Sequence, residues 1–124
     1  MNGMRQTVLA FFLSAAFLLG SNVSGKWTGR LRYDGADTSL PAVLILEQDG
    51  NRIKGTGGPD VSRQQPFEIG TIDGNTVHLE RHAGQDGVIV LELKLENGQL
   101  VGKMSMRHGA ETRTATLSLK KEGD

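Results

Sequence analysis

The densest cluster of chemistry-bearing residues is the stretch His78-x-Glu80-x-His82. Alternate residues of a β-strand share one face and lie about 7 Å apart, so the three side chains could approach a metal ion together, with His108 as a further ligand. A tetrahedral zinc site needs four ligands, and one strand supplies too few. We therefore expect a solvated strand face here, and the sequence predicts no metal and no other cofactor.

No motif indicates a catalytic centre. The chain has three histidines, several serines and no cysteine. It contains no Gly-x-Ser-x-Gly elbow, no His-Glu-x-x-His zinc motif, no phosphate-binding loop and no dinucleotide fingerprint. The acidic residues are spread over turns and polar strand positions, with no sign of a paired dyad. We predict that the protein is not an enzyme.

The N-terminal segment predicts export. Residues 1–6 carry one positive charge, residues 8–19 are almost wholly apolar, and small or polar residues follow. This order is typical of a secretory signal peptide, and the apolar run is too short to span a bilayer. We expect residues 1–21 to be a signal peptide, with cleavage between positions 20 and 25. Residues 22–124 would then form a single periplasmic or secreted domain, without stable membrane insertion after cleavage.

The composition of the expected domain excludes several partner classes. Without Arg5 it has one acidic residue more than it has basic residues, so its net charge is about −1. Nucleic acids select for basic surfaces, and so do anionic lipids, so neither is expected as a partner. Trp27, Tyr33 and Phe67 are its only aromatic residues. They are too few for a row of stacking platforms.

Turn signals recur with a fixed period. Asp49-Gly50, Asp73-Gly74 and Asn97-Gly98 follow one another at intervals of 24 residues. Asp-Gly and Asn-Gly are strong hairpin signals because tight turns need positive φ angles. The segments between the turns alternate apolar and polar residues, as half-buried strands do. We expect eight strands, at residues 26–33, 41–48, 52–57, 67–72, 76–82, 88–96, 99–107 and 112–120.

Successive one-sided strands have to bury their apolar faces against one another. Closure into a barrel achieves this and leaves no exposed sheet edge. Glycines within the strands suit the close approaches that closure requires; they are Gly29, Gly55, Gly70 and Gly102. We predict an all-β fold, an eight-stranded antiparallel up-and-down barrel, with a two-sheet sandwich as the alternative. Residues 42–46 are apolar on both faces, and the pattern does not assign their parity.

Several short motifs resemble those of small secreted bacterial lipocalin-like domains of the calycin type. They are Trp27-Thr28-Gly29, Gly70-Thr71-Ile72-Asp73-Gly74-Asn75 and Gly98-Gln99-Leu100-Val101-Gly102, with a similar repeat at 49–56. The resemblance covers nearly all of residues 25–120 and implies a lipocalin-like barrel. It also implies that Trp27 packs at the closed end, under a cation of the last strand, either Arg113 or Lys120. The other lipocalin sequence blocks are missing, and the biotin-holding residues of avidins have no counterparts.

Two binding functions remain open. An apolar barrel interior could hold a small apolar ligand, or its side chains could simply fill the barrel. The candidate ligand-binding residues are Trp27, Leu31, Ile53, Leu91 and Met104. The alternative is a protein-interaction or inhibitor module with a filled barrel, which would bind its partner through a loop at 58–66. Asp60, Arg63 and Gln64 are the candidate partner-binding residues of that loop.

Overall fold

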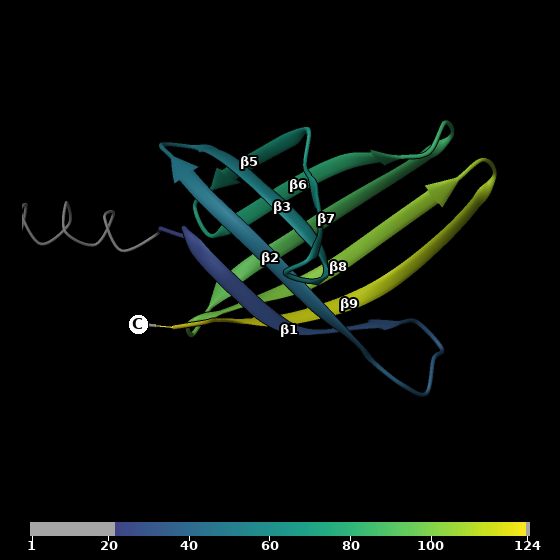
Figure 1. Ribbon diagram of the computed structural model, residues 1–124, viewed down its shortest axis with the longest axis horizontal. Helices are drawn as coiled ribbons and strands as arrows, with labels where there is room; N and C mark the ends of the chain where they lie inside the picture. The colour runs from purple at the N-terminus through teal and green to yellow at the C-terminus, as the bar shows by residue number, and fades with distance from the viewer. Residues whose placement is uncertain (1–21, 124) are drawn as a thin grey trace, which may run out of the picture.

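A computed structural model describes residues 22–123 as a closed antiparallel β-barrel (Figure 1). The expected signal peptide at 1–21 lies outside the described residues. The described residues include no helix that could cross a membrane. The strands are β1 (Gly25–Tyr33), β2 (Leu40–Asp49), β3 (Arg52–Asp60), β4 (Arg63–Pro66), β5 (Ile69–Asp73), β6 (Thr76–Ala83), β7 (Gly87–Glu96), β8 (Gln99–His108) and β9 (Glu111–Lys121).

The short strands β4 and β5 act as one interrupted strand of the barrel wall. Both pair antiparallel with β3, Pro66 opposite Thr56 and Thr71 opposite Arg52. Between them, the Phe67 amide donates a hydrogen bond of 2.9 Å to the Gly55 carbonyl. Counted in this way, eight strands follow one another around the wall, and β1 closes it by pairing with both β2 and β9. The predicted eight-stranded antiparallel barrel is confirmed.

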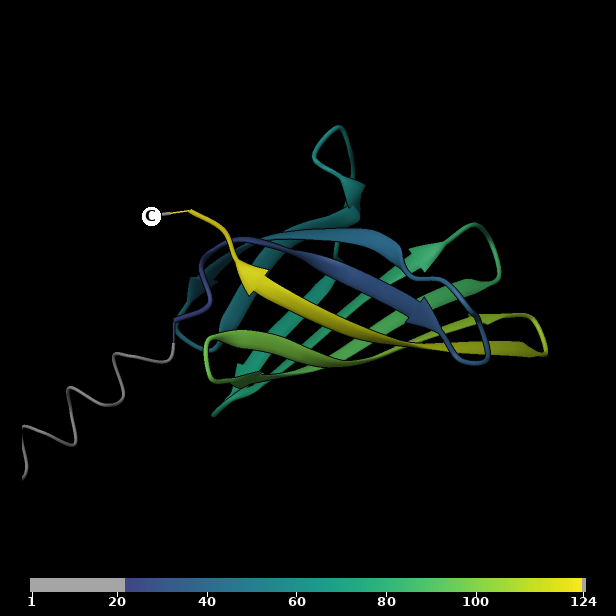
Figure 2. The same cartoon turned by 90° about the horizontal axis from the view of Figure 1, so that it is seen from below.

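The period of 24 residues has a simple spatial meaning. Each period spans two strands, so the three glycine-containing turns lie at the same end of the barrel. The start of β1 and the end of β9 lie at this end too (Figures 1 and 2). The β3–β4 turn at residues 61–62 projects from the side of the barrel (Figure 2), and the connections around residues 34–39, 84–86 and 109–110 lie at the opposite end. We call these the Trp27 end and the open end.

The predicted faces agree with burial on β6 to β9, and the structure settles the parity of β2. Ala42, Leu44 and Leu46 point inward and are buried, whereas Ile45 is 39% exposed on the outer face. Val43 also lies on the outer face, yet it is buried. Its carbonyl accepts a hydrogen bond of 3.2 Å from the Gln64 amide, so the neighbouring hairpin reaches across this part of β2.

The glycines within the strands are sites of close approach between neighbouring strands. A Cβ atom added at Gly29 would lie 1.9 Å from the Ser118 carbonyl oxygen, and one at Gly102 would lie 2.0 Å from the Glu92 carbonyl oxygen. Such distances are far below van der Waals contact. The glycines allow the wall to coil, as expected, but they do not enlarge the interior, because neighbouring backbone occupies the space a side chain would fill.

The expected loop at 58–66 is a β-hairpin instead. β3 continues to Asp60 and β4 begins at Arg63, which leaves Val61 and Ser62 as the turn. The sequence analysis missed it because Gly57-Gly58-Pro59 is typical of a loop. In the hairpin, the Arg63 carbonyl oxygen lies close to Gly58, because glycine has no Cβ atom. A Cβ atom added at Gly58 would lie 1.7 Å from that oxygen.

The turns at the Trp27 end need glycine for conformational reasons. Gly74 is the first central residue of the turn between Asp73 and Thr76 and has a φ of +61°, as in a type II′ turn. The turn after Glu96 differs, since Asn97 and Gly98 both have positive φ angles, as in a type I′ turn.

Replacing Gly74 by valine is expected to lower the free energy of unfolding by about 1–3 kcal/mol, because a β-branched residue resists positive φ. A Cβ atom at Gly74 meets no atom within 4 Å, so a steric clash would not contribute. Urea unfolding followed by circular dichroism measures the loss. Gly74→Asn is the matched control and should lose less, since asparagine tolerates this conformation. Equal losses in the two variants would contradict the backbone explanation.

Candidate functional site

The Trp27 end of the barrel is solidly packed. Trp27 is 2% exposed, and its indole Nε1 donates a hydrogen bond of 2.9 Å to the Val23 carbonyl. Val23 is itself fully buried, and its amide donates to Oε1 of Gln48 at 2.9 Å. The segment before β1 therefore folds over this end as a plug. The other fully buried large side chains fill the interior around it: Val77, Leu79, Leu93, Leu100, Leu117 and Leu119.

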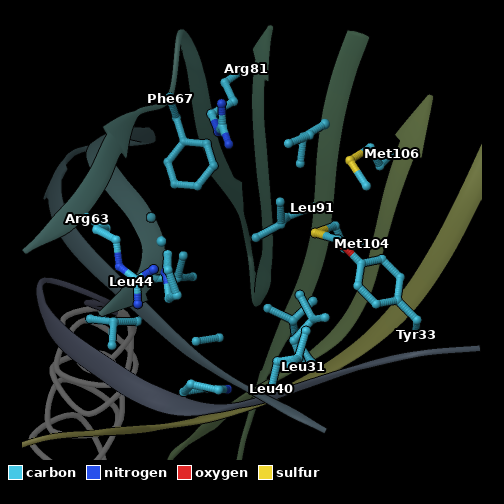
Figure 3. Close-up of a pocket in the computed structure, with 18 residues that line it drawn as sticks. Leu31, Tyr33, Leu40, Leu44, Arg63, Phe67, Arg81, Leu91, Met104 and Met106 are labelled. Atoms are coloured by element: carbon cyan, nitrogen blue, oxygen red, sulfur yellow. The ribbon is translucent and has the colours of Figure 1, made fainter. Parts of the chain in front are cut away.

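The other half of the barrel is hollow. A cavity of about 530 Å³ opens at the open end, and its wall is mostly aliphatic, aromatic and thioether side chains (Figure 3). Phe67 lies on one side, whereas Tyr33, Met104 and Met106 lie on the other. Leu31, Leu40, Leu44, Ile89, Leu91 and Leu117 also line the cavity. The barrel is thus packed at the Trp27 end and hollow at the open end.

The structure divides the five ligand-binding candidates into two groups. Leu31, Leu91 and Met104 line the cavity. Trp27 and Ile53 do not, and both are buried in the packed half. The alternation along a strand predicts which face a side chain occupies, but it says nothing of how deep along the barrel axis that side chain lies. Phe67 and Tyr33, which also line the cavity, were named only as two of the few aromatic residues of the domain.

Among the residues that the structure describes, Arg63 and Arg81 are the only charged ones that line the cavity, and no acidic residue lines it. Arg63 is bound by Asp60, with 2.6 Å between Nη2 and Oδ2. Arg81 differs, because its guanidinium donates to Oε1 of Gln65 at 2.9 Å and to the His82 carbonyl at 3.2 Å. Among the described residues, no carboxylate lies within salt-bridge distance of Arg81.

The three candidate partner-binding residues are engaged within their own hairpin. Hydrogen bonds from Arg63 and Ser62 lower the pKa of Asp60 to about 2. Gln64 accepts a hydrogen bond of 2.7 Å from the Thr56 hydroxyl and donates one of 2.9 Å to the Asp60 carbonyl. These contacts order the hairpin. Val61 at its tip is 56% exposed.

The cation expected over Trp27 is not there. Arg113 stacks instead on the ring of Tyr33 at the open end, 4.0 Å from the ring centroid. Lys120 is exposed on the outer face of β9, opposite Thr28. Arg113 lies too far along the strand to reach Trp27, whose partner on β9 is Lys121. The segment at Val23 forms the plug, and neither Arg113 nor Lys120 takes part in it.

His78, Glu80 and His82 form two separate polar clusters on the outer wall. The His78 ring lies between two carboxylates, with Nε2 2.5 Å from Glu80 Oε2 and Nδ1 2.5 Å from Glu92 Oε1. His82 Nδ1 lies 2.7 Å from Glu68 Oε1 instead. No group of three metal-ligating side chains that could hold an ion occurs within residues 22–123. Hydrogen bonds that the protonated His78 ring donates to the Glu80 and Glu92 carboxylates raise the pKa of His78.

The stability of the barrel is expected to fall as the pH rises above about 6.5 and through the raised pKa of His78. The pKa of His78 is above its ordinary value of 6.5 in the folded state, so protonated His78 stabilises the fold. This contribution is complete below pH 6.5 and is lost as the pH rises through the raised pKa. Urea unfolding at several pH values measures it. His78→Gln should flatten the dependence, and an unchanged pH slope in that variant would contradict the assignment.

The antiparallel eight-stranded barrel is consistent with the lipocalin-like resemblance in its strand order. No protein-family model, no curated protein and no solved structure matches the chain. The fold assignment therefore rests on the register and closure of the strands, and a functional assignment has to rest on the geometry of the cavity.

Proposed function

We propose that this protein is a lipocalin-like binding protein that holds one small, largely apolar molecule in the open half of its barrel. The observation that carries the proposal is the cavity of about 530 Å³, lined by leucine, methionine and aromatic side chains. Ligand pockets typically have volumes of about 300–1,000 Å³ and mostly apolar walls with a few polar groups. The packed Trp27 end makes the other half a cup that is closed at its base.

Dye binding tests this proposal. Titration with the uncharged dye N-phenylnaphthylamine should give saturable fluorescence with one site per barrel, and competing apolar molecules should displace the dye. Native mass spectrometry of protein from its own exported fraction should reveal a bound small mass that is lost on denaturation. A protein that binds neither the dye nor a co-purifying molecule would overturn the proposal.

The charge of the cavity wall favours a ligand with an anionic head. An apolar tail would contact Leu91 and Met104. The anionic head would lie beside the guanidinium of Arg81 and would replace Gln65 Oε1 as its hydrogen-bond acceptor. The ligand class that fits is an amphiphile with one carboxylate or similar anion. Hydrogen bonds to charged partners contribute about 1.5–3 kcal/mol, so the head should contribute measurably to affinity.

Decanoate is therefore expected to displace the dye at about a tenfold lower concentration than decanol, which has the same chain without the charge. Arg81→Gln should abolish this preference and leave the affinity for decanol unchanged. Arg107→Gln is the matched control, because Arg107 is an exposed cation near the same end that does not line the cavity. If both variants lose the preference for decanoate, the overall positive charge at this end, and not Arg81 itself, would cause that preference.

We further propose that residues 1–21 are removed as a signal peptide and that the domain acts in the periplasm or outside the cell. Burial of Val23 supports cleavage before that residue. Cleavage after Gly25 would remove both Val23 and the carbonyl that accepts the Trp27 hydrogen bond. It would thus open the plug at the Trp27 end.

A further inference from the structure

Basic residues gather on one wall of the barrel. On β1, β8 and β9, which are neighbours in the sheet, no outward-facing position carries an acidic residue. Six outward-facing positions carry basic residues, and we call this set the cationic wall: Lys26, Arg30, Arg32, Lys103, Arg107 and Lys120. The outward acids of the strands lie on the remaining wall, among them Glu47, Asp73, Glu80, Glu92 and Glu96.

Most of the cationic wall is not neutralised by the protein itself. Lys26 forms a salt bridge of 2.8 Å with Glu122. The other five basic residues of the wall have no carboxylate within salt-bridge distance among the described residues. Glu92, which lies opposite Lys103 in the register, is bound by His78 instead. The wall therefore presents uncompensated positive charge although the domain as a whole is nearly neutral.

Hydroxyl groups separate the cations in a regular way. Thr116 of β9 lies between Arg32 of β1 and Lys103 of β8, and Lys103 Nζ is 3.5 Å from the Thr116 hydroxyl. In the adjacent row, Ser118 lies opposite Arg30. Strands are about 4.8 Å apart, so an anionic group above Thr116 could contact cations on both sides.

The two arginines of β1 are held in place by the β1–β2 connection. Arg30 donates to the Ser39 hydroxyl at 2.9 Å and to its carbonyl at 2.8 Å, and Arg32 donates to the Ala36 carbonyl at 2.9 Å. Each guanidinium has five N–H donors, so others remain for a ligand. Both arginines line a shallow groove of about 460 Å³ together with Thr116 and Ser118. Asp34 lies in the lining of the same groove and accepts a hydrogen bond from the Thr114 hydroxyl.

We propose that the cationic wall binds a polysaccharide that carries sulfate or phosphate groups. Charge complementarity favours a polyanion, and the alternation of cations with hydroxyls suits the mixed anionic and hydroxyl groups of such a chain. A membrane surface fits less well, because interfacial binding adds apolar and aromatic side chains, and the outward positions of this wall hold no aromatic residue and one apolar residue, Val101. Single-stranded nucleic acid would need aromatic stacking platforms as well.

Heparin, a sulfated polysaccharide, is the probe for this site. The triple variant Arg30→Gln, Arg32→Gln, Lys103→Gln removes three charges from the cationic wall. The matched control removes three exposed charges from the remaining wall: Arg52→Gln, Lys54→Gln, Lys94→Gln. Both variants change the net charge equally, and both should retain wild-type thermal stability because all six side chains are exposed.

Affinity for heparin is expected to be lower by about tenfold or more in the first variant and nearly unchanged in the control. The dependence of affinity on salt should weaken by about one unit of log–log slope per lost contact. Amide NMR shifts on heparin addition should be confined to β1, β8, β9 and the β1–β2 connection, and uncharged dextran should cause none. Equal losses in the two variants, or no heparin binding at low salt, would overturn the proposal. Tighter binding to anionic lipid vesicles or to single-stranded DNA would overturn the choice of a polysaccharide.

Discussion

Trp27→Ala is expected to lower the free energy of unfolding by about 3–5 kcal/mol. The indole is 2% exposed and belongs to the plug at the Trp27 end, together with Val23. Its removal leaves a cavity that the tightly coiled wall cannot fill, because neighbouring strands already touch at Gly29 and Gly102. It also removes the donor to the Val23 carbonyl. Since domains of this size are stable by about 5–15 kcal/mol, the loss is a large fraction of the total.

Urea unfolding followed by circular dichroism at the β-sheet minimum measures this loss without relying on indole fluorescence. Trp27→Phe is the matched control. This variant retains an aromatic ring. It loses part of the side-chain volume and the whole hydrogen bond to the Val23 carbonyl, so its free energy of unfolding should fall clearly less than that of Trp27→Ala. A loss below about 1 kcal/mol for Trp27→Ala would show that Trp27 does not hold the end closed.

The sequence predicts most of the fold because strand faces and tight turns are local properties. The 24-residue period fixes the hairpins, and the alternation on β7 and β9 identifies the buried side chains, such as Leu93 and Leu117. The division of one barrel strand into β4 and β5 was not predicted. The break falls at Phe67, whose ring lies over Gly57 of β3, and the pairing of β3 with both short strands exists only in the assembled sheet.

The candidate site was predicted only in part, because depth along the barrel and the distribution of charge are properties of the assembled structure. Leu91 and Leu93 are equivalent in pattern, yet Leu91 lines the cavity and Leu93 is packed beneath it. Likewise, the net charge of about −1 argues against polyanions only if charges are evenly mixed. Antiparallel pairing instead places Arg30, Arg32 and Lys103 on one wall and the carboxylates that bind His78 on another.

Ala42→Phe should weaken ligand binding without unfolding the barrel, with dye affinity lower by about tenfold or more. Ala42 is 7% exposed, points inward from β2 and lies opposite Gly29, which has no side chain to obstruct it. It also lines the cavity, so a phenylalanine ring at this position would occupy space that is otherwise available to a ligand. Burial of added apolar surface in existing space favours the fold, so we expect stability to be retained.

Fluorescence titration with the uncharged dye, paired with thermal unfolding of the same samples, separates loss of binding from loss of fold. Val90→Phe is the matched control, because Val90 lies on the outer face of β7 and its replacement adds a ring without entering the barrel. Met106→Trp fills the same cavity from β8 and should weaken dye binding in the same way. It therefore tests the cavity even if the phenylalanine at position 42 perturbs β2. A dye that binds both filled variants as tightly as it binds the wild type would have to occupy another site. The cavity at the open end would then not be the binding site, however well its volume and lining suit one.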